Sequence, residues 1–197
     1  MTKKVIFESE KPVYIFKICL IGSAGVGKTS IAQRLCCDTF DAGTKLTIGI
    51  DFYTYDLPII VNGENTFVMV SIWEFGEQRQ FRKLFPYYIC GANGIFLVFD
   101  LTQMQSLINL DWWYDRLEEH NMLNHPKTLI GTKLDLVDEE SNQFKVNELN
   151  IEEFLNNHDE KDFIKTSAMK DINIRDSFKK MIKKVLDFNN LDYQRIP

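Results

Sequence analysis

Short apolar runs alternate along the chain with segments in which apolar residues recur at helical spacing. Four of these runs are rich in β-branched and aromatic residues, which is typical of strands buried on both faces of a parallel sheet. They cover residues 13–21, 94–100, 126–132 and 163–166. Two further segments, 51–61 and 66–73, flank the dipeptide Asn62-Gly63, which predicts a hairpin and an antiparallel edge strand.

The segments between the strands have the apolar spacing of helices. The helices that we expect cover residues 28–37, 78–90, 106–121, 147–157 and 172–187. Regular alternation of strands and helices predicts an α/β fold with a six-stranded, mostly parallel sheet, one antiparallel edge strand and five helices on its two faces. In such folds a ligand binds at the carboxyl ends of the strands.

Composition limits the class of protein further. A chain of 197 residues, 45% of them hydrophobic, fits one globular domain that buries roughly 70% of its unfolded surface without disulfides. The four cysteines lack metal-ligand spacing, which indicates reduced thiols. A net charge of -5 with scattered Lys and Arg argues against nucleic-acid binding.

Neither end of the chain carries a targeting signal that we can identify. No apolar run approaches the 18 or so residues of a membrane span, and the first ten residues contain acids where a secretory signal needs an apolar stretch. The last residues, NNLDYQRIP, contain no cysteine for a C-terminal lipid. We expect a cytoplasmic monomer that reaches membranes only through partners.

The motif GSAGVGKT follows a predicted strand and opens a predicted helix, which is the context of a P-loop. Its glycines let successive backbone N–H groups point at phosphate oxygens, and the helix N-terminus adds a positive dipole. Lys28 would neutralise β/γ-phosphate charge, and Thr29 would bind Mg²⁺. The predicted phosphate-binding residues are Gly22, Ser23, Ala24, Gly25, Val26, Gly27, Lys28, Thr29 and Ser30.

A second motif, Thr132-Lys133-Leu134-Asp135, follows another predicted strand. An Asp there can accept two hydrogen bonds from guanine N1–H and N2–H₂, which adenine does not offer. With this motif the sequence resembles the Ras superfamily of small GTPases over about residues 13–187. A P-loop kinase of small molecules remains an alternative, but it would leave the second motif without a purpose.

The resemblance implies roles for further residues. Thr47 is similar to the threonine that binds Mg²⁺ in the GTP state, Glu74 stands where the family has an acid that holds Mg²⁺ through water, and Gln78 matches the residue that positions the attacking water. The implied catalytic residues are therefore Lys28, Thr47 and Gln78, with Thr29, Thr47 and Glu74 at the metal. The implied guanine-binding residues are Phe40, Thr132, Lys133, Asp135, Ser167, Ala168 and Met169.

Within the superfamily the string TIGIDF is similar to the Rab branch, whose aromatic patch is read by effector proteins. The matching residues here are Ile48, Phe52, Trp73 and Tyr88. Taken without the family, the three aromatic residues favour ordinary core packing. The string TKLD is similar to the Rho branch, and Trp-acid-x-Gly-x-Gln is similar to yeast septation GTPases, so we expect a Rab-like protein without assigning a subfamily.

Several positions depart from the family pattern. Glu77 replaces the glycine whose N–H contacts the γ-phosphate, unless a one-residue shift gives that role to Gly76; the sequence leaves both open. Ala24 replaces a glycine that leaves room for the catalytic glutamine. Met169 replaces a lysine near the guanine, which we expect base binding to tolerate.

The sequence thus predicts a Ras-like G domain at residues 12–188, with an N-terminal extension at 1–11 and a short tail at 189–197. We expect a GTP/GDP switch with bound Mg²⁺, slow hydrolysis, and effector, exchange-factor and GTPase-activating partners. The departures at Glu74, Glu77 and Ala24 leave a second hypothesis open, a GTP-binding scaffold with little or no hydrolysis.

Overall fold

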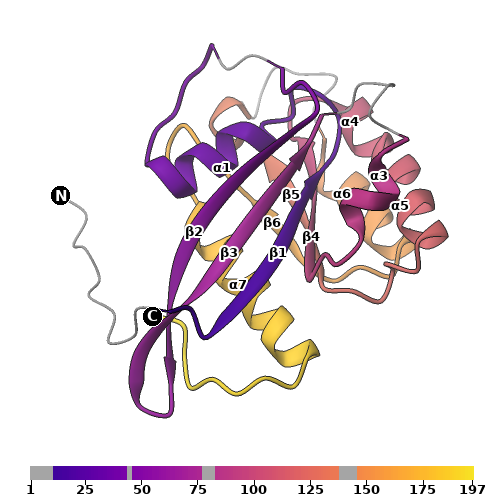
Figure 1. The fold of residues 1–197 in the computed structure, drawn as a ribbon. Helices are drawn as coiled ribbons and strands as arrows, with labels where there is room; N and C mark the ends of the chain where they lie inside the picture. Colours follow the sequence, from indigo (N-terminus) through magenta and orange to yellow (C-terminus); the bar gives the residue numbers. More distant parts are fainter. Residues whose placement is uncertain (1–10, 44–45, 77–82, 138–145) are drawn as a thin grey trace.

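The computed structural model describes residues 11–43, 46–76, 83–137 and 146–197, which fold around a six-stranded sheet (Figure 1). The strands are β1 (Tyr14–Ile21), β2 (Ile50–Val61), β3 (Glu64–Phe75), β4 (Gly94–Asp100), β5 (Lys127–Thr132) and β6 (Phe163–Lys165). Their order is β2-β3-β1-β4-β5-β6, and every neighbouring pair is parallel except β2 with β3. The predicted α/β fold with one antiparallel edge strand is confirmed.

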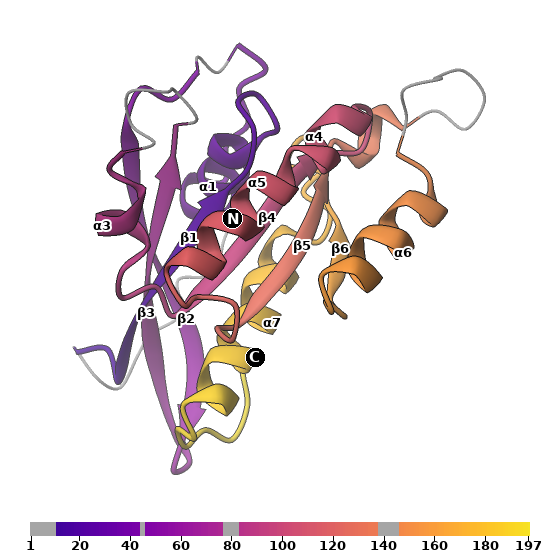
Figure 2. The same cartoon turned by 90° about the vertical axis from the view of Figure 1, so that its right-hand side faces the viewer.

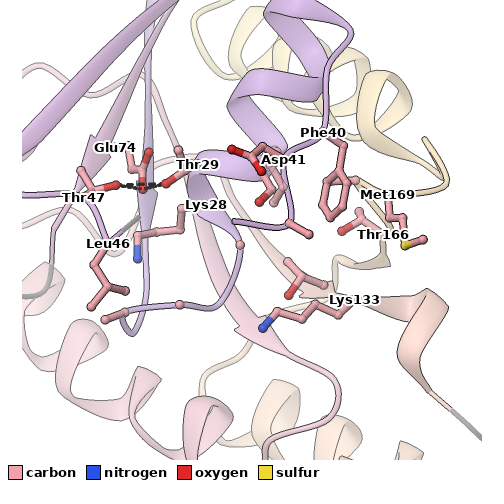
Figure 3. Close-up of a pocket in the computed structure, with 18 of the residues that line it drawn as sticks. Lys28, Thr29, Phe40, Asp41, Leu46, Thr47, Glu74, Lys133, Thr166 and Met169 are labelled. Atoms are coloured by element: carbon pink, nitrogen blue, oxygen red, sulfur yellow. Dashed lines mark hydrogen bonds between the residues drawn. The ribbon is translucent and has the colours of Figure 1, made fainter. Parts of the chain in front are cut away.

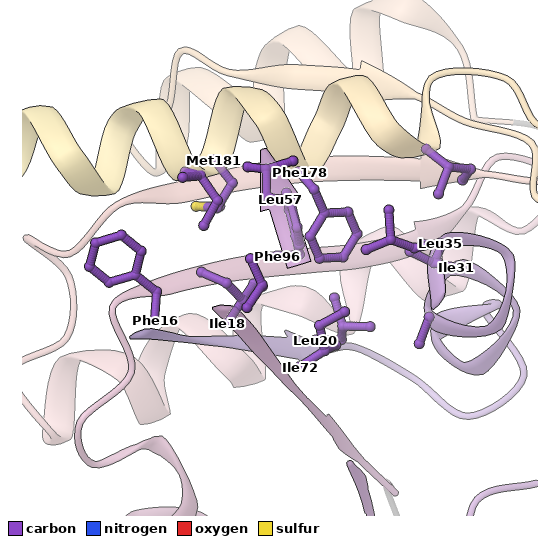
Figure 4. Packing of buried hydrophobic residues seen from close by; sticks show 14 of the residues in the cluster. Phe16, Ile18, Leu20, Ile31, Leu35, Leu57, Ile72, Phe96, Phe178 and Met181 are labelled. Carbon is purple, nitrogen blue, oxygen red and sulfur yellow. The ribbon is translucent and has the colours of Figure 1, made fainter. Parts of the chain in front are cut away.

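Helices cover both faces of the sheet (Figures 1 and 2). They are α1 (Lys28–Cys37), α3 (Phe85–Ile89), α4 (Met104–Ile108), α5 (Leu110–Glu119), α6 (Glu148–Asn157) and α7 (Ile174–Phe188), with a 3-10 turn η1 at Leu134–Leu136. On one face α1 and α7 pack on the sheet, and Phe178 of α7 meets Phe96 of β4 edge-to-face at 5.0 Å (Figure 4). On the other face α3, α5 and α6 form a second apolar layer.

The hairpin between β2 and β3 forms at the predicted turn. Asn62 and Gly63 both have positive φ angles, 51° and 83°, as a two-residue turn of this hand requires. The structure extends the predicted second strand from 66–73 to Glu64–Phe75. This hairpin joins the segment around Thr47 to Glu74, so its register positions both residues.

Two helix predictions need correction. The single helix predicted at 106–121 is divided at Asn109 into α4 and α5, although φ −63° and ψ −14° keep this residue helical. The Asn109 side chain donates to Ser23 Oγ at 3.1 Å, so the division lies where the helix contacts the P-loop. Of the helix predicted at 78–90, the part from residue 83 onwards is described, and within it α3 occupies Phe85–Ile89. Residues 77–82 lie outside the described part, so the start of that prediction is untested.

The last nine residues, predicted as a short tail, fold back onto the sheet. Ile60 of β2 donates its N–H to Arg195 O at 2.9 Å and accepts from Gln194 N at 2.8 Å. Leu191, Tyr193 and Ile196 pack against the core layer beneath α7. The chain therefore ends beside the hairpin, at the opposite end of the sheet from the P-loop (Figure 1). Residues 1–10 of the predicted N-terminal extension lie outside the described residues.

Candidate functional site

The P-loop connects β1, in the middle of the sheet, to the first turn of α1. Gly22 has φ 146°, and a Cβ there would lie 2.1 Å from the carbonyl oxygen of Val98 on the neighbouring strand β4. Gly27 caps α1 in the left-handed conformation, with φ 98°. A side chain at position 22 would collide with β4, and the left-handed backbone at position 27 disfavours any residue with a Cβ. The loop therefore curls closely over the strand ends, as phosphate binding requires.

Lys28 is buried, with 4% of its surface exposed, although it carries a charge. Its ammonium group donates to the carbonyl oxygens of Gly22 and Ser23, at 2.9 and 2.8 Å. These bonds fold the side chain back over the loop, so that its charge lies where the loop curls (Figure 3). A buried cation held by neutral oxygens is well suited to bind an anion.

The guanine-motif residues follow β5. Thr132 Oγ1 donates to Val26 O of the P-loop at 2.6 Å, and Lys133 has the left-handed backbone angle φ 57°. The Lys133 ammonium group lies 2.7 Å from a carboxylate oxygen of Asp100, a buried residue at the end of β4. One hydrogen bond and one ion pair thus join three neighbouring strand ends.

Asp135, the acid of this motif, lies in the 3-10 turn η1. Ser167 Oγ donates a hydrogen bond to Asp135 Oδ1 and accepts one from Lys170 N at 3.0 Å. Ser167 is fully buried and is not among the residues that line the cavity, and its hydroxyl holds the Asp135 carboxylate. The neighbouring Ala168 carbonyl accepts a bond from Arg34 of α1 at 2.7 Å, which fixes the loop after β6.

Three oxygen-bearing side chains converge beside Lys28. Glu74 Oε1 accepts hydrogen bonds from Thr29 Oγ1 at 2.6 Å and from Thr47 Oγ1 at 2.8 Å (Figure 3). Burial raises the pKa of Glu74 above its usual value, and the bonds from the two threonines and the charge of Lys28 oppose this rise. Among the described residues no group of three or more His, Cys, Asp or Glu side chains has the arrangement of a metal site. A cation here would depend on hydroxyl and phosphate oxygens as well as the one carboxylate.

One cavity of about 400 Å³ brings these groups together. Figure 3 shows Thr29, Thr47 and Glu74 near one end and Phe40 and Met169 near the other. The predicted residues that line it are Ala24, Gly25, Gly27, Lys28, Thr29, Ser30, Phe40, Thr47, Glu74, Thr132, Lys133, Asp135, Ala168 and Met169. The other predicted P-loop residues do not line the cavity but make contacts that hold the loop: Gly22 with β4, Ser23 with Lys28 and Val26 with Thr132.

Sequence reasoning missed part of the site. Asp41 and Leu46 line the cavity, and Asp100 and Arg34 hold the loops that form it. Asp100 is the last residue of the apolar strand β4, so an acid at that strand end was a signal in the sequence that could have pointed to it. Arg34 gives no such signal, because its contact spans more than a hundred residues of sequence.

Gly76 packs tightly against the segment that contains Thr47. Its N–H donates to Gly49 O at 2.8 Å, and a Cβ would lie 2.5 Å from Thr47 O. The Gly76 N–H would therefore have to exchange the Gly49 carbonyl for a phosphate oxygen if it contacts the γ-phosphate, so this alternative stays open. Glu77 and Gln78, on which the other alternative depends, lie outside the described residues.

The aromatic residues predicted as an effector patch adjoin one another. Phe52 meets Trp73 edge-on with ring centroids 4.6 Å apart, and Trp73 lies 6.3 Å from Tyr88. Trp73 and Tyr88 are partly buried against the apolar layer, as core packing predicts, whereas Phe52 is 58% and Ile48 75% exposed. The ammonium group of Lys17 lies 3.5 Å from the Trp73 ring centroid. Together these side chains form an amphipathic surface next to the cavity.

The sheet order, the glycine-rich turn after β1 and the TKLD segment after β5 define a G domain of the Ras type. A family model described as Ras family matches residues 17–187. The chain belongs to the Ras family and is Rab-like within it.

Relatives agree with this assignment over most of their length. The chain is 32% identical to the Ras-related protein RABA4a of Arabidopsis thaliana, over 92% of this chain and 76% of the relative. It is 32% identical to the Ras-related protein Rab11D of Nicotiana tabacum, over 92% and 78%. It is 31% identical to the GTP-binding protein ypt1 of Schizosaccharomyces pombe, over 87% and 80%.

The remaining sequence expectations concern cysteines and membranes. All four cysteines are free, and burial raises the pKa of Cys19 to about 12, so that thiol is inert. None of the helices in the described residues has both the length and the apolar character needed to span a membrane.

Proposed function

We propose that this small GTPase binds GTP and GDP with Mg²⁺ in the 400 Å³ cavity and recruits effector proteins in its GTP state. The observation that carries the proposal is the meeting, in one cavity, of the P-loop lysine, the Thr29–Thr47–Glu74 group and Asp135. A nucleotide with its phosphates at the P-loop and its base at Asp135 needs a cavity that reaches both, as this one does. An adenine would leave the carboxylate of Asp135 without the donors that guanine offers.

On the phosphate side, Lys28 and the loop N–H groups would bind the β- and γ-phosphates. Lys28 would exchange its two carbonyl partners for phosphate oxygens, a gain because charge-assisted bonds are stronger than bonds between neutral groups. A bound Mg²⁺ would neutralise charge that develops between the β- and γ-phosphates. Thr29, Thr47 and Glu74 present the oxygen atoms that suit this cation.

Binding of the γ-phosphate would hold Thr47 and the chain around it in place, and its loss would release them. The exposed residue Ile48 follows Thr47 directly, and the exposed Phe52 comes five residues after Thr47. The aromatic surface with Trp73 and Tyr88 would therefore change with the nucleotide, and we propose it as the effector site. Exchange factors and GTPase-activating proteins are the expected regulators of such a cycle.

Hydrolysis by this chain would transfer the γ-phosphate to water at a slow intrinsic rate, at or below about 10⁻⁴ s⁻¹. Gln78 would orient the water, and Glu77 would strain the approach of the backbone to the γ-phosphate, since its carboxylate must face away from like charge. Exchanging Glu77→Gly should raise the single-turnover rate and favour GTP over GDP. An unchanged rate and preference would show that Glu77 is accommodated without strain.

The second candidate, a GTP-binding scaffold with little hydrolysis, is favoured by Glu74, which fills the region between the two threonines. One experiment separates the candidates. The protein is purified without added nucleotide, denatured in acid, and the released nucleotide is identified by chromatography. GDP supports the switch, and GTP supports the scaffold. An adenine nucleotide, or none, would contradict both.

A further inference from the structure

The side chain of Glu74 reaches further into the site than the family's pattern implies. Its Oε1 atom lies 2.6 Å from Thr29 Oγ1 and 2.8 Å from Thr47 Oγ1, and the two hydroxyl oxygens lie 3.0 Å apart (Figure 3). The three oxygen atoms therefore form a nearly equilateral triangle. They come from α1, from the segment before β2, and from β3.

The size of this triangle matches the coordination shell of a small divalent cation. Mg²⁺ binds six oxygens at about 2.0–2.1 Å, and neighbouring ligands of an octahedron are √2 times further apart, about 2.8–3.0 Å. The separations of 2.6, 2.8 and 3.0 Å are close to the edge lengths of one octahedral face.

The second carboxylate oxygen gives an independent indication. Glu74 is buried, with 2% of its surface exposed, and it lines the cavity. Its Oε2 atom has no hydrogen-bond partner among the described residues. Burying a carboxylate with one oxygen unbonded is unfavourable, and the positive charge of a cation bound at Oε1 would offset part of that cost.

We propose that Glu74 is a direct ligand of the divalent cation, in place of the water through which the family's shorter acid acts. Glutamate is one methylene longer than aspartate and reaches about 1.5 Å further. The extra length lets one oxygen share a face of the coordination shell with Thr29 and Thr47. This inference rests on the proposed function, because the phosphates of the nucleotide supply further ligands.

The proposal fixes the number of water molecules on the cation. Thr29, Thr47, Glu74 and one oxygen each from the β- and γ-phosphates occupy five of six positions, which leaves one water. In a Glu74→Asp variant the shorter side chain withdraws and a second water enters. A Glu74→Gln variant keeps the length but loses the charge, so it should retain one water and bind the cation about tenfold or more weakly.

The test uses the full chain loaded with a non-hydrolysable GTP analogue and Mn²⁺. Electron paramagnetic resonance in ¹⁷O-enriched water counts the waters bound to Mn²⁺ from line broadening. We expect one water in the unaltered protein and two in Glu74→Asp. Equal counts in the two proteins would overturn the inference.

The same samples are denatured to measure bound nucleotide, which separates the inference from the function on which it rests. Equimolar nucleotide with equal water counts would overturn the direct ligand alone. Absence of nucleotide from the unaltered protein would overturn the proposed function and the inference with it.

Discussion

Lys28 is held by backbone oxygens of the P-loop, and it is the cation that we propose to bind the phosphates. Its ammonium group is held by Gly22 O and Ser23 O, and its side chain is buried against the loop. Replacing it removes a cation from a region where phosphate charge would be poorly solvated. The loss should therefore appear in nucleotide affinity.

We expect Lys28→Ala to weaken GDP and GTP binding about a thousandfold or more, equivalent to about 4 kcal/mol. Titration calorimetry measures the change. Lys17→Ala is a suitable control, because Lys17 lies over the Trp73 ring outside the cavity. Affinity close to that of the unaltered protein would contradict the assignment of the P-loop.

Asp135 carries the prediction on base choice. Asp135→Asn should shift preference from guanine towards xanthine nucleotides, because the amide donates to xanthine O2 where the carboxylate only accepts. Competition between XTP and GTP measures the shift. The control is Asp111→Asn, an exposed acid paired with His158. An unchanged preference for GTP would mean that Asp135 does not contact the base.

At the level of single residues, the sequence predicted the parts of the site that lie in continuous motifs. Thr29 and Asp135 were placed in the cavity by motif alone. The contacts that span different motifs, such as Lys133 with Asp100 and Arg34 with Ala168, depend on how strands and helices pack. No local pattern encodes such a distance, so these residues had to come from the structure.

Buried hydrogen bonds connect the strands and loops that form the site. Thr132 at the end of β5 donates to Val26 O in the P-loop, and both atoms belong to buried residues. This bond joins the base side of the cavity to the phosphate side. Its removal would leave the Val26 carbonyl without that partner inside the protein.

We therefore expect Thr132→Val, which preserves volume, to reduce stability by about 1–2 kcal/mol and to weaken nucleotide binding about tenfold. Urea unfolding and calorimetry measure the two effects. Thr128→Val is the matched control, since Thr128 is also buried on β5 and its hydroxyl, among the described residues, donates only to the adjacent Lys127 carbonyl. Equal effects of both substitutions on nucleotide affinity would show that the contact is not specific.

The predicted strands were accurate because continuous apolar runs bounded by turns leave few alternatives. All seven residues of β4 are buried, as expected of a central parallel strand. Helix ends were less accurate. The division at Asn109 follows from its contact with Ser23, 86 residues away in sequence, which apolar spacing does not report.

For the whole molecule, the unexpected feature is the docked C-terminal segment. The sequence predicts a short tail at 189–197, but Leu191, Tyr193 and Ile196 pack on the same core layer as α7. Tyr193 Oη also donates to Asp187 Oδ1 at 2.8 Å. The segment connects α7 to the tip of the hairpin and so stabilises the sheet far from the cavity.

Deleting residues 190–197 should lower the free energy of unfolding by about 3 kcal/mol, the loss of three partly buried apolar side chains, and leave GDP affinity unchanged. Urea unfolding and calorimetry measure these quantities. Tyr193→Phe keeps the ring and removes only the hydroxyl contacts, so its effect should be much smaller. A deletion that leaves the unfolding midpoint in place would show that the segment contributes nothing to stability.

The same segment has a consequence for solubility. β2 is the outermost strand of its side of the sheet, and unpaired strand edges recruit strands from other molecules. Here the outward N–H and C=O of Ile60 are bonded to the segment, and the next outward position is Pro58, which has no N–H to offer. The outward position after that is Asp56, whose charge disfavours the approach of another strand. Intermolecular strand addition is thereby discouraged along the end of the hairpin, and a shortened chain that also carried Pro58→Thr would be prone to aggregate through this strand.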